Sequence, residues 1–376
     1  MMQKIKILHI QETIGSGGVE RRRLSLAKHL DKNLFDQKFI CTFAFGNIPE
    51  EIRAEGFEVI PIGQLKSPFQ WSQHKKVQKI IAEYQPDIIH GAVFEGVTMA
   101  AINGWIKKVP IIIIEETSDP QNRSWKGNLL MKIFSKMADK VIGVSEAVTE
   151  EYLMGKLKLS AQKAITINNG VALPRIVRSE EVSVVKRKWD IADNDFIIGS
   201  TGRMLQDSHK RFSDLINAFA WFSKEKANVK LLLVGDGPEK SNYESLVLEL
   251  GIPDKVIFTG YQSDVTLFYQ VMDVFALVSA REAFGLVLAE AMLNNLPVIA
   301  TKVGGMKYIV ERDITGFLIN PFQVDEIAEK MESLYQNPIL RNEMGLAGKQ
   351  KADRKYSENI YINKISNLYR SLIQTK

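Results

Sequence analysis

The sequence contains a single cysteine and no long apolar run, and each shortage excludes a class of protein. With only Cys41, the 376-residue chain forms no internal disulfide, which fits a reducing compartment. Cys41 lies within Phe39-Ile40-Cys41-Thr42-Phe43, so we expect a buried strand thiol and not a nucleophile. No stretch approaches the ~20 apolar residues that cross a bilayer, and the apolar run at residues 4–10 is too short for a signal peptide. We therefore expect a cytoplasmic protein.

Sequence motifs typical of metal-binding and dinucleotide-binding sites are also missing. No cluster of histidines and cysteines has metal-ligand spacing, so no metal site is expected. The turn Gly15-Ser16-Gly17-Gly18-Val19-Glu20 follows a first strand, but Glu20 stands where the dinucleotide fingerprint needs its third glycine. The second expected strand, residues 38–45, ends without the acid that binds a ribose. A nicotinamide-dependent dehydrogenase is therefore disfavoured, and we expect no cofactor.

The composition is that of a soluble globular protein, with 45% hydrophobic and 25% charged residues. The length exceeds one ordinary core and suits two domains. A net charge of +5 permits an anionic partner, although it does not distinguish nucleic acid, lipid and nucleotide. We expect no nucleic-acid partner.

Strand-like segments alternate with helical ones along the chain. This alternation is typical of parallel sheets with helices on both faces, so we expect an α/β fold with doubly wound, Rossmann-like domains. The expected strands are residues 5–10, 38–45, 59–62, 87–90, 110–114, 140–145 and 164–167 in the first half, and 196–200, 230–234, 256–261, 274–278 and 315–319 in the second.

Two glutamates flank a helix start in the second half. The strand 274–278 leads to Glu282, then to Phe284-Gly285, and then to an apolar helix that carries Glu290. A helix beginning near Phe284 places Glu290 about 9 Å along its axis at ~1.5 Å per residue, with free N–H groups at the carboxyl edge of the sheet. The two carboxylates can then hold opposite ends of one ligand, a sugar at Glu282 and a ribose at Glu290. The alternative is a carboxylate near a helix dipole and a solvated helix residue.

Two cations follow a glycine turn at the start of the second half. Arg203 and Lys210 lie in the run from Thr201 to Phe212, ahead of an amphipathic helix expected at 213–222. Fixed cations beside a glycine turn suit a diphosphate group, because they neutralise the negative charge on its oxygens. The alternative for each cation is ordinary surface charge.

These motifs together resemble the donor site of the retaining, GT-B-fold glycosyltransferases of family 4. The resemblance rests on Glu282-x7-Glu290 with Phe-Gly inside it, Leu-Pro-Val-Ile-Ala-Thr at 296–301, the Gly202-Arg203…Lys210 run, Pro-Asp-Ile-Ile-His at 86–90 and Asn169-Gly170-Val171. It implies two domains facing a central cleft: residues 1–173 completed by a C-terminal helix at 356–376, and residues 174–355. It further implies transfer of a sugar from a nucleoside diphosphate sugar, with UDP-sugar favoured, to a hydroxyl acceptor, with retention and without a metal ion.

The resemblance assigns a role to each candidate site residue. Glu282, Arg203 and Lys210 are the expected catalytic residues, with Glu282 at the donor sugar and the two cations at the diphosphate. The expected donor-binding residues are Gly17, Gly18, Gly202, Tyr261 in the loop for the base, Phe284, Gly285, Leu286, and Glu290 at the ribose.

Several positions depart from the family pattern. Ala283, Asn295 and Arg211 stand where glycine is usual, and the strand ending at Ile114 lacks the histidine that commonly touches the donor sugar. The possible replacements on the acceptor side are Glu116, Thr117 and Asp119. His90 is expected at a strand end facing the cleft, or else as a hydrogen-bonded structural residue.

Residues 121–140 form a basic amphipathic stretch. Its lysines recur every four residues at 132, 136 and 140, and its apolar stripe is Leu129, Leu130, Ile133, Phe134 and Met137. One interpretation is docking on an anionic membrane that presents a lipid-linked acceptor, at the inner face of the membrane. The other is an ordinary helix with its lysines in water.

The expected partners are thus a nucleotide sugar and a glycan, lipid-linked or small-molecule acceptor. Two rival functions remain open. A sugar-nucleotide epimerase of similar shape would convert the donor without an acceptor, and a catalytically silent subunit would bind the donor without turnover.

Overall fold

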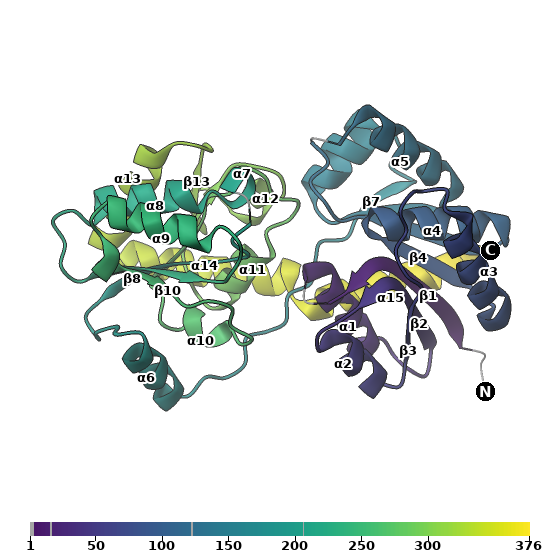
Figure 1. The fold of residues 1–376 in the computed structure, drawn as a ribbon, viewed down its shortest axis with the longest axis horizontal. Helices are drawn as coiled ribbons and strands as arrows, with labels where there is room; N and C mark the ends of the chain where they lie inside the picture. Colours follow the sequence, from purple (N-terminus) through teal and green to yellow (C-terminus); the bar gives the residue numbers. More distant parts are fainter. Residues whose placement is uncertain (1–3, 16, 122, 206) are drawn as a thin grey trace. The chain divides into compact units, whose positions relative to one another are not determined.

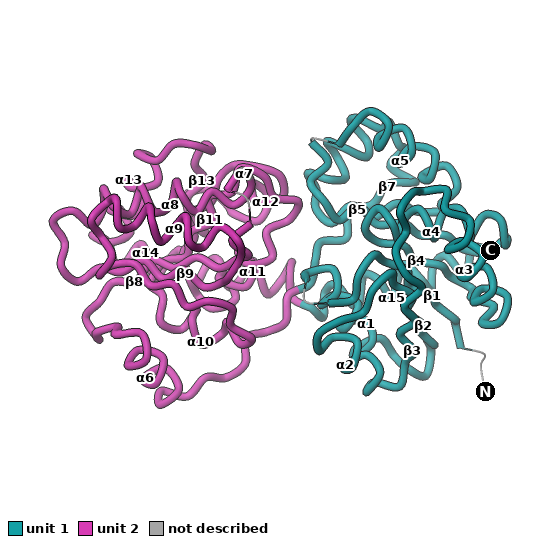
Figure 2. The backbone as a smooth tube through the Cα atoms, viewed as in Figure 1, with its two compact units in different colours: residues 1–170, 358–376 teal, residues 171–357 magenta. Residues whose placement is uncertain are grey.

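The computed structural model describes residues 4–15, 17–121, 123–205 and 207–376. The chain divides into two compact units, coloured separately in Figure 2: unit 1 is residues 1–170 with 358–376, and unit 2 is residues 171–357. The sequence motifs place these boundaries at 173/174 and 355/356. Ser16, Asn122 and Gln206, which belong to the glycine turn, the basic stretch and the cation run, lie outside the described residues.

Unit 1 is built, in its described part, on a seven-stranded sheet in the order β3-β2-β1-β4-β5-β6-β7, with every strand parallel to its neighbours (Figure 1). The register places Ile7 of the first strand opposite Ile88 of the fourth. The strands are β1 (Ile5–Ile14), β2 (Phe35–Ala44), β3 (Glu58–Pro61), β4 (Ile88–Ala92), β5 (Ile111–Glu116), β6 (Lys140–Gly143) and β7 (Ala164–Thr166).

Helices cover both faces of this sheet. Successive strand residues point to opposite faces, so Leu8 joins the core beneath α3, α4 and α5, whereas Ile7 joins the core beneath α1 and α15. The helices are α1 (Gly18–His29), α2 (Ile48–Ala54), α3 (Trp71–Tyr84), α4 (Val93–Ile106), α5 (Trp125–Met137), the π-helix η1 (Ala147–Lys156) and α15 (Glu358–Thr375). The doubly wound architecture predicted from the alternating pattern is confirmed here.

The last helix, α15, belongs to unit 1 although the whole of unit 2 precedes it (Figure 2). Its Tyr361, Ile365 and Tyr369 are buried in one core with Ile88 and other sheet residues. Gly170 permits this approach, because a Cβ at that position would lie 2.5 Å from the Tyr361 Cβ.

Unit 2 has a six-stranded parallel sheet in its described part, in the order β10-β9-β8-β11-β12-β13. Ile198, Leu231 and Leu233 of the sheet form one core with apolar residues of α8, α9 and α13. The strands are β8 (Phe196–Thr201), β9 (Val229–Val234), β10 (Val256–Phe258), β11 (Val274–Leu277), β12 (Val298–Thr301) and β13 (Gly316–Ile319). The helices are α6 (Ser179–Lys188), α7 (Asp207–Lys210), α8 (Phe212–Phe222), α9 (Lys240–Glu249), the 3₁₀ helix η2 (Pro253–Lys255), α10 (Thr266–Tyr269), α11 (Leu286–Leu293), α12 (Met306–Ile309), α13 (Val324–Gln336) and α14 (Pro338–Tyr356).

The strand order of unit 2 reverses between β8 and β11, and in unit 1 between β1 and β4. Ligands of open α/β sheets bind outside the carboxyl ends of the strands at such a reversal. The runs that follow β8 and β11 carry Arg203, Lys210 and Glu282, so the fold brings the predicted donor residues of unit 2 to one edge.

Several element boundaries differ from the predicted ones, and one of them lies in the predicted donor site. Helix α11 begins at Leu286 and not near Phe284, because Gly285 has φ +105° and ψ +52°, a left-handed conformation that precedes the helix. In the part of the chain that the structure describes, none of the helices is both long enough and apolar enough to span a membrane.

Candidate active site

The turn after β8 presents Arg203 at the sheet edge. The amide of Met204 donates to the carbonyl of Asp236 at 2.8 Å, which fastens this turn to the turn after β9. The two turns approach closely at glycines, since a Cβ on Gly235 would lie 1.9 Å from the carbonyl oxygen of Gly202. The Arg203 side chain is exposed at this edge. The turn therefore places the solvated Arg203 cation beside the backbone of two glycines.

Lys210 and Glu282 meet across the reversal point. Lys210 Nζ lies 2.5 Å from Glu282 Oε2, and the two side chains are 26% and 19% exposed. The amide of Ala280 donates to the carbonyl of His209 at 2.7 Å, which joins the two loops by backbone as well. The structure thus brings together one predicted cation and one predicted carboxylate.

Arg211, which replaces a usual glycine, adopts the backbone conformation for which glycine is suited. Its φ of +54° and ψ of +42° lie in the left-handed region, where a side chain is disfavoured by ~1–2 kcal/mol. The guanidinium makes two bonds to the carboxylate of Asp214, at 2.8 and 2.6 Å, and lies 3.3 Å from Asp207. These ion pairs offset the backbone strain and hold the residue that follows Lys210.

The loop carrying Glu282 rests on two glycines that the sequence motifs do not single out. The amide of Gly305 donates to the Glu282 carbonyl at 3.1 Å. A Cβ on Gly304 would lie 1.7 Å from that carbonyl oxygen, and one on Gly305 would lie 2.6 Å from the Ala283 oxygen. The adjacent Gly-Gly pair is the sequence signal that could have revealed this backbone support.

The Phe-Gly-Leu opening of α11 has a structural role. Phe284 is 2% exposed and packs edge-on against Tyr356 with 5.5 Å between the ring centroids. Gly285 supplies the left-handed turn, and Leu286 is half-buried at the first position of α11. The Phe284 side chain is therefore part of the core, and any ligand contact at this position comes from the backbone.

Glu290 lies on α11 and accepts a hydrogen bond from the Tyr269 hydroxyl at 2.8 Å. The predicted base loop leads into the short helix that carries Tyr269. In that loop Gly260 has φ +69°, its carbonyl accepts the Gly235 amide at 3.0 Å, and Tyr261 is 65% exposed. Residues predicted for base and ribose are thus linked through α10.

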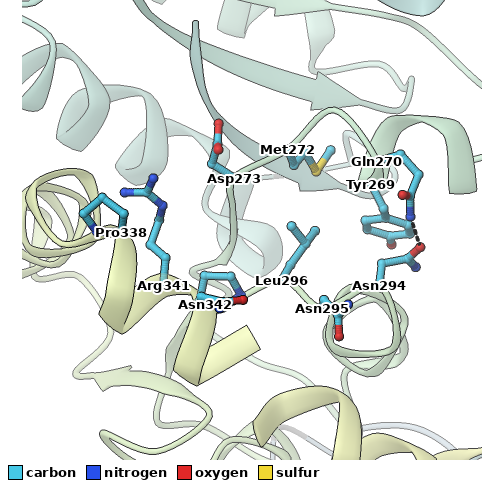
Figure 3. A pocket seen from close by; sticks show the side chains of 11 residues that line it. Tyr269, Gln270, Met272, Asp273, Asn294, Asn295, Leu296, Pro338, Arg341 and Asn342 are labelled. Carbon is cyan, nitrogen blue, oxygen red and sulfur yellow. Dashed lines mark hydrogen bonds between the residues drawn. The ribbon is translucent and has the colours of Figure 1, made fainter. Parts of the chain in front are cut away.

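A pocket of about 270 Å³ lies at the other end of these strands (Figure 3). Asp273 and Pro297 in its lining immediately precede β11 and β12, so the pocket opens at the amino ends of the strands. Glu282 follows the carboxyl end of β11. The pocket is therefore separate from Glu282, although its lining includes Tyr269, which donates a hydrogen bond to Glu290.

In unit 1 the glycine turn leads into α1 at the carboxyl end of β1. Thr13 Oγ1 donates to Glu20 Oε1 at 2.9 Å, which folds the acid back over the turn. A Cβ on Gly17 would lie 2.3 Å from the other oxygen of Glu20. Gly18 is the first residue of α1, so its amide and the next ones lack helical partners.

The expectation that His90 faces a cleft is wrong, and the structural alternative holds. His90 is 0% exposed, and its Nδ1 lies 2.7 Å from the Tyr369 hydroxyl. Burial, followed by the charge of Arg23, lowers the pKa of His90 to about 4. The physical reason is register: His90 shares the face of Ile88, which α15 covers.

Beside His90 lies a buried carboxylate that the sequence reasoning missed. Glu115 is 2% exposed and forms ion pairs with Arg22 and, at 3.1 Å, with Arg23, both from α1. Burial alone would raise the pKa of Glu115, but Arg22, His90 and Arg23 together lower it well below its usual value. The sequence signal is a charge that continues the apolar strand Ile111–Ile114.

Of the three acceptor-side candidates, Glu116 is fully engaged. It is 4% exposed, Arg123 binds both of its oxygens, and Ser118 Oγ donates to one at 2.7 Å. Asp119 is half-buried and accepts the amide of Gln121 at 3.0 Å on Oδ1. Its Oδ2 is buried without a hydrogen-bond partner among the described residues. Asp119 is thus better placed than Glu116 to bind a hydroxyl, while Thr117 is half-buried.

Helix α5 exposes a different apolar stripe from the one expected. Phe134 is 1% exposed and packs in the core with Met131. Trp125, Leu129 and Ile133 are 70%, 51% and 39% exposed and recur every four residues, so they share one face. Exposed lysines at 126, 132 and 136 lie on the same helix.

Within the described residues, no group of three or more histidine, cysteine, aspartate or glutamate side chains is placed to hold a metal ion. One Asp-x-Asp triplet, Asp193 to Asp195, precedes β8 at the amino end of the strand. Lys186 pairs with Asp193 at 3.0 Å, and Lys230 lies 3.8 Å from Asp195. The triplet is therefore a turn paired with lysines.

Comparisons with known proteins agree with this geometry. Residues 16–175 match Glycosyltransferase Family 4, and residues 182–351 match Glycosyl transferases group 1. An uncharacterised glycosyltransferase of Haemophilus influenzae is 28% identical over 373 residues, 96% of this chain and 97% of that protein. The N-acetyl-alpha-D-glucosaminyl L-malate synthase of Bacillus anthracis is 28% identical over 248 residues, 66% of this chain and 63% of that protein.

Solved structures show the same fold. A glycosyltransferase of Rickettsia africae has a TM-score of 0.86 at 24% identity, covering 100% of both chains. Anabaena Alr3699/HepE in complex with UDP has a TM-score of 0.86 at 22% identity, covering 98% of this chain and 100% of that one. The chain therefore belongs to the GT-B-fold glycosyltransferases of family 4, with a group 1 domain in its second half. It is a glycosyltransferase.

Proposed function

We propose that this glycosyltransferase moves a sugar from a nucleoside diphosphate sugar to a hydroxyl acceptor, with retention at the anomeric carbon and without a metal ion. The observation that carries the proposal is the meeting of Lys210 with Glu282 at the carboxyl ends of β8 and β11, beside the exposed Arg203. Cations and a carboxylate at one strand reversal suit a ligand that has both phosphates and hydroxyl groups.

The chemical roles follow from the charges. Arg203 and Lys210 stabilise the diphosphate as negative charge develops on the leaving oxygen, which is the task that a divalent ion performs in other enzymes. Glu282 accepts hydrogen bonds from the donor sugar, and Glu290 accepts them from the ribose. Within unit 1, Gly17, Gly18 and the free amides at the start of α1 are the proposed donor-binding groups.

UDP-sugar is the favoured donor. Anabaena Alr3699/HepE, a structural neighbour at 22% identity, was solved with UDP-glucose as well as with UDP. Retention is supported by the names of relatives, since the Bacillus anthracis and Streptococcus pneumoniae enzymes are named for alpha-linked products. Common nucleotide sugars carry an α-configured anomeric carbon, so an α-linked product preserves it.

We propose that the acceptor is a glycan or a lipid-linked glycan, and that the protein docks on an anionic membrane. Relatives include a Staphylococcus aureus capsular polysaccharide glycosyltransferase and alpha-monoglucosyldiacylglycerol synthases, so related enzymes are named for glycan and for lipid products. The exposed stripe Trp125, Leu129 and Ile133, with lysines on the same helix, supports interfacial binding, because apolar side chains enter the bilayer surface while lysines meet lipid phosphates. Asp119 is the proposed hydroxyl-binding residue of unit 1.

The test is an activity screen with product analysis. Purified protein is first screened against UDP, GDP and ADP by thermal shift, and the preferred sugar nucleotide is then incubated with glycan and lipid-linked acceptors. We expect transfer that survives EDTA and an α-linked product by NMR. Donor conversion without an acceptor would favour an epimerase instead. Donor binding without turnover across the acceptor panel would favour a silent subunit, and a β-linked product or loss of activity in EDTA would overturn retention or metal independence.

A further inference from the structure

The side chain of Glu290 is held by a tyrosine to which the proposed chemistry gives no role. The Tyr269 hydroxyl donates to Glu290 Oε2 at 2.8 Å, and Tyr269 is only 2% exposed. The bond thus crosses from the end of α10 to the middle of α11, inside unit 2. A buried hydroxyl bonded to a carboxylate fixes the rotamer of that carboxylate, because a charge-assisted hydrogen bond is strong and directional.

A second hydroxyl completes the arrangement. Thr201 Oγ1 lies 3.2 Å from the Tyr269 hydroxyl oxygen, and Thr201 is 3% exposed. When Tyr269 donates to Glu290, its oxygen is left to accept the Thr201 proton, so the order Thr201 to Tyr269 to Glu290 satisfies all three groups. Thr201 is the last residue of β8, immediately before Gly202 and Arg203. The relay therefore ties the diphosphate turn to the carboxylate on α11.

The same two helices are joined at a second point, visible in Figure 3. Gln270 Nε2, just after α10, donates to Asn294 Oδ1, just after α11, at 2.8 Å, which is the dashed line in Figure 3. Asn294 Nδ2 in turn donates to the backbone carbonyl of Glu290 at 2.9 Å. This second link holds the backbone of α11 and makes no bond to the carboxylate of Glu290. The chain thus offers two links between α10 and α11 that differ in what they fix.

We propose that Tyr269 is a positioning residue for nucleotide binding, and that it holds Oε2 of Glu290 so that Oε1 accepts the ribose hydroxyls. The proposal rests on the proposed function, in which Glu290 receives the ribose. Among the described residues no hydrogen bond is formed to Oε1, whereas Oε2 is occupied by Tyr269. Because α10 follows the loop predicted to receive the base, Tyr269 also sets the ribose carboxylate at a fixed distance from that loop.

The experiment measures affinity for two nucleotides that differ only in the ribose. Calorimetric Kd values are compared for UDP and for 2′,3′-dideoxy-UDP, with wild type, Tyr269→Phe, Glu290→Gln and the double variant. Phenylalanine keeps the buried ring and removes the hydroxyl. We expect Tyr269→Phe to weaken UDP binding roughly tenfold, the size of one charge-assisted hydrogen bond, and to leave dideoxy-UDP binding unchanged. In turnover, KM for the donor rises while kcat stays close to that of wild type.

The double variant and a matched control sharpen the result. Glu290→Gln should give a similar ribose-specific loss, and Tyr269→Phe should add little to it, because both changes remove one interaction. Gln270→Ala breaks the other link between the helices and should leave the UDP to dideoxy-UDP ratio at its wild-type value.

Each contrary outcome has a separate meaning. If Tyr269→Phe lowers the affinity for UDP and for dideoxy-UDP equally, the positioning role is overturned. It is also overturned if Tyr269→Phe binds UDP with wild-type affinity while Glu290→Gln binds it more weakly. Either result leaves the proposed function intact. Wild-type UDP affinity in Glu290→Gln overturns the ribose assignment itself.

Discussion

Lys210 Nζ and Glu282 Oε2 lie 2.5 Å apart, so the cation assigned to the diphosphate and the carboxylate assigned to the donor sugar form one ion pair. Both side chains are partly exposed, at 26% and 19%, and such pairs contribute only ~0–1 kcal/mol. Lys210 can therefore turn toward a phosphate at small cost. The pair also keeps the two groups beside each other at the strand reversal.

Substitution should separate the roles of these two residues. Glu282→Ala is expected to lower kcat far more than nucleotide affinity, because the carboxylate faces the sugar and not the diphosphate. Lys210→Ala should weaken both, by a few kcal/mol at most, because it removes a charge that the diphosphate meets before and during bond breaking. Steady-state kinetics and UDP calorimetry measure the two effects, with Lys224→Ala, an exposed lysine just after the end of α8, as the control. Full activity in both site variants would overturn the assignment.

Backbone support of Glu282 by Gly304 can be tested by adding a single methyl group. A Cβ at Gly304 would meet the Glu282 carbonyl at 1.7 Å, so Gly304→Ala must displace the loop that carries the carboxylate. We expect kcat to fall by on the order of 100-fold, as for other ångström-scale misplacements of a catalytic group. Gly251→Ala is the matched control, since Gly251 also has positive φ, +69°, but a Cβ there would meet no atom within 4 Å. Equal activity in the two variants would show that the loop tolerates the shift.

Acid should destabilise unit 1 through its buried histidines. The pKa of His90 is about 4 in the folded chain, against 6.5 for an ordinary histidine, chiefly because of burial and then because of Arg23. As the pH falls, the histidine is therefore protonated in the unfolded chain before it is protonated in the folded chain. The free energy of unfolding that is present above pH 6.5 is lost as the pH falls toward 4. The loss amounts to about 3 kcal/mol for His90, and His9, whose pKa is also lowered by burial, acts in the same direction.

Denaturant unfolding between pH 7 and pH 4 measures this loss. His90→Gln should be less stable than wild type at pH 7, because its bond to Tyr369 is disturbed, but should show a shallower decline toward pH 4. Identical slopes in the two proteins would contradict the assignment of this pH dependence to His90.

Membrane docking is expected to depend on α5. The variant Trp125→Ser with Leu129→Ser removes the two most exposed apolar side chains of the stripe, so binding to phosphatidylglycerol vesicles should fall roughly tenfold. Vesicle sedimentation at low salt measures it, and added salt should weaken wild-type binding through screening of the lysines. Trp221→Ser on α8 is the control, because Trp221 is a similarly exposed tryptophan of unit 2 at 62%. Wild-type protein that ignores anionic vesicles would end this part of the proposal.

The fold was predictable from sequence because its strands are apolar runs with clear periodicity. Segments such as Ile111 to Ile114 indicate a strand buried on both faces, and alternation with helices then dictates a parallel sheet. Helix starts were less certain, since α11 begins only after the left-handed Gly285. Backbone conformation at one residue decides that boundary, and glycine composition alone does not reveal it.

The sequence predicted the site residues whose role depends on charge and spacing. It was less informative about residues whose position depends on what buries them. Glu282 and Lys210 lie in adjacent loops, as their positions after neighbouring strands suggest. His90 was misplaced because the partner that buries it, Tyr369, is 279 residues away in sequence. Tyr269 and Glu115 went unnoticed because their partners, Glu290 and Arg22, come from other elements of the fold.

In the proposed function, cations of unit 2 bind the diphosphate, and Glu282 and Glu290 bind the sugar and the ribose on either side of it. A crystal structure of the protein with a bound sugar nucleotide tests it most directly. We predict phosphate oxygens within hydrogen-bond reach of Lys210 and Arg203, the sugar at Glu282 and the ribose at Glu290. A sugar nucleotide bound away from both glutamates would contradict the account.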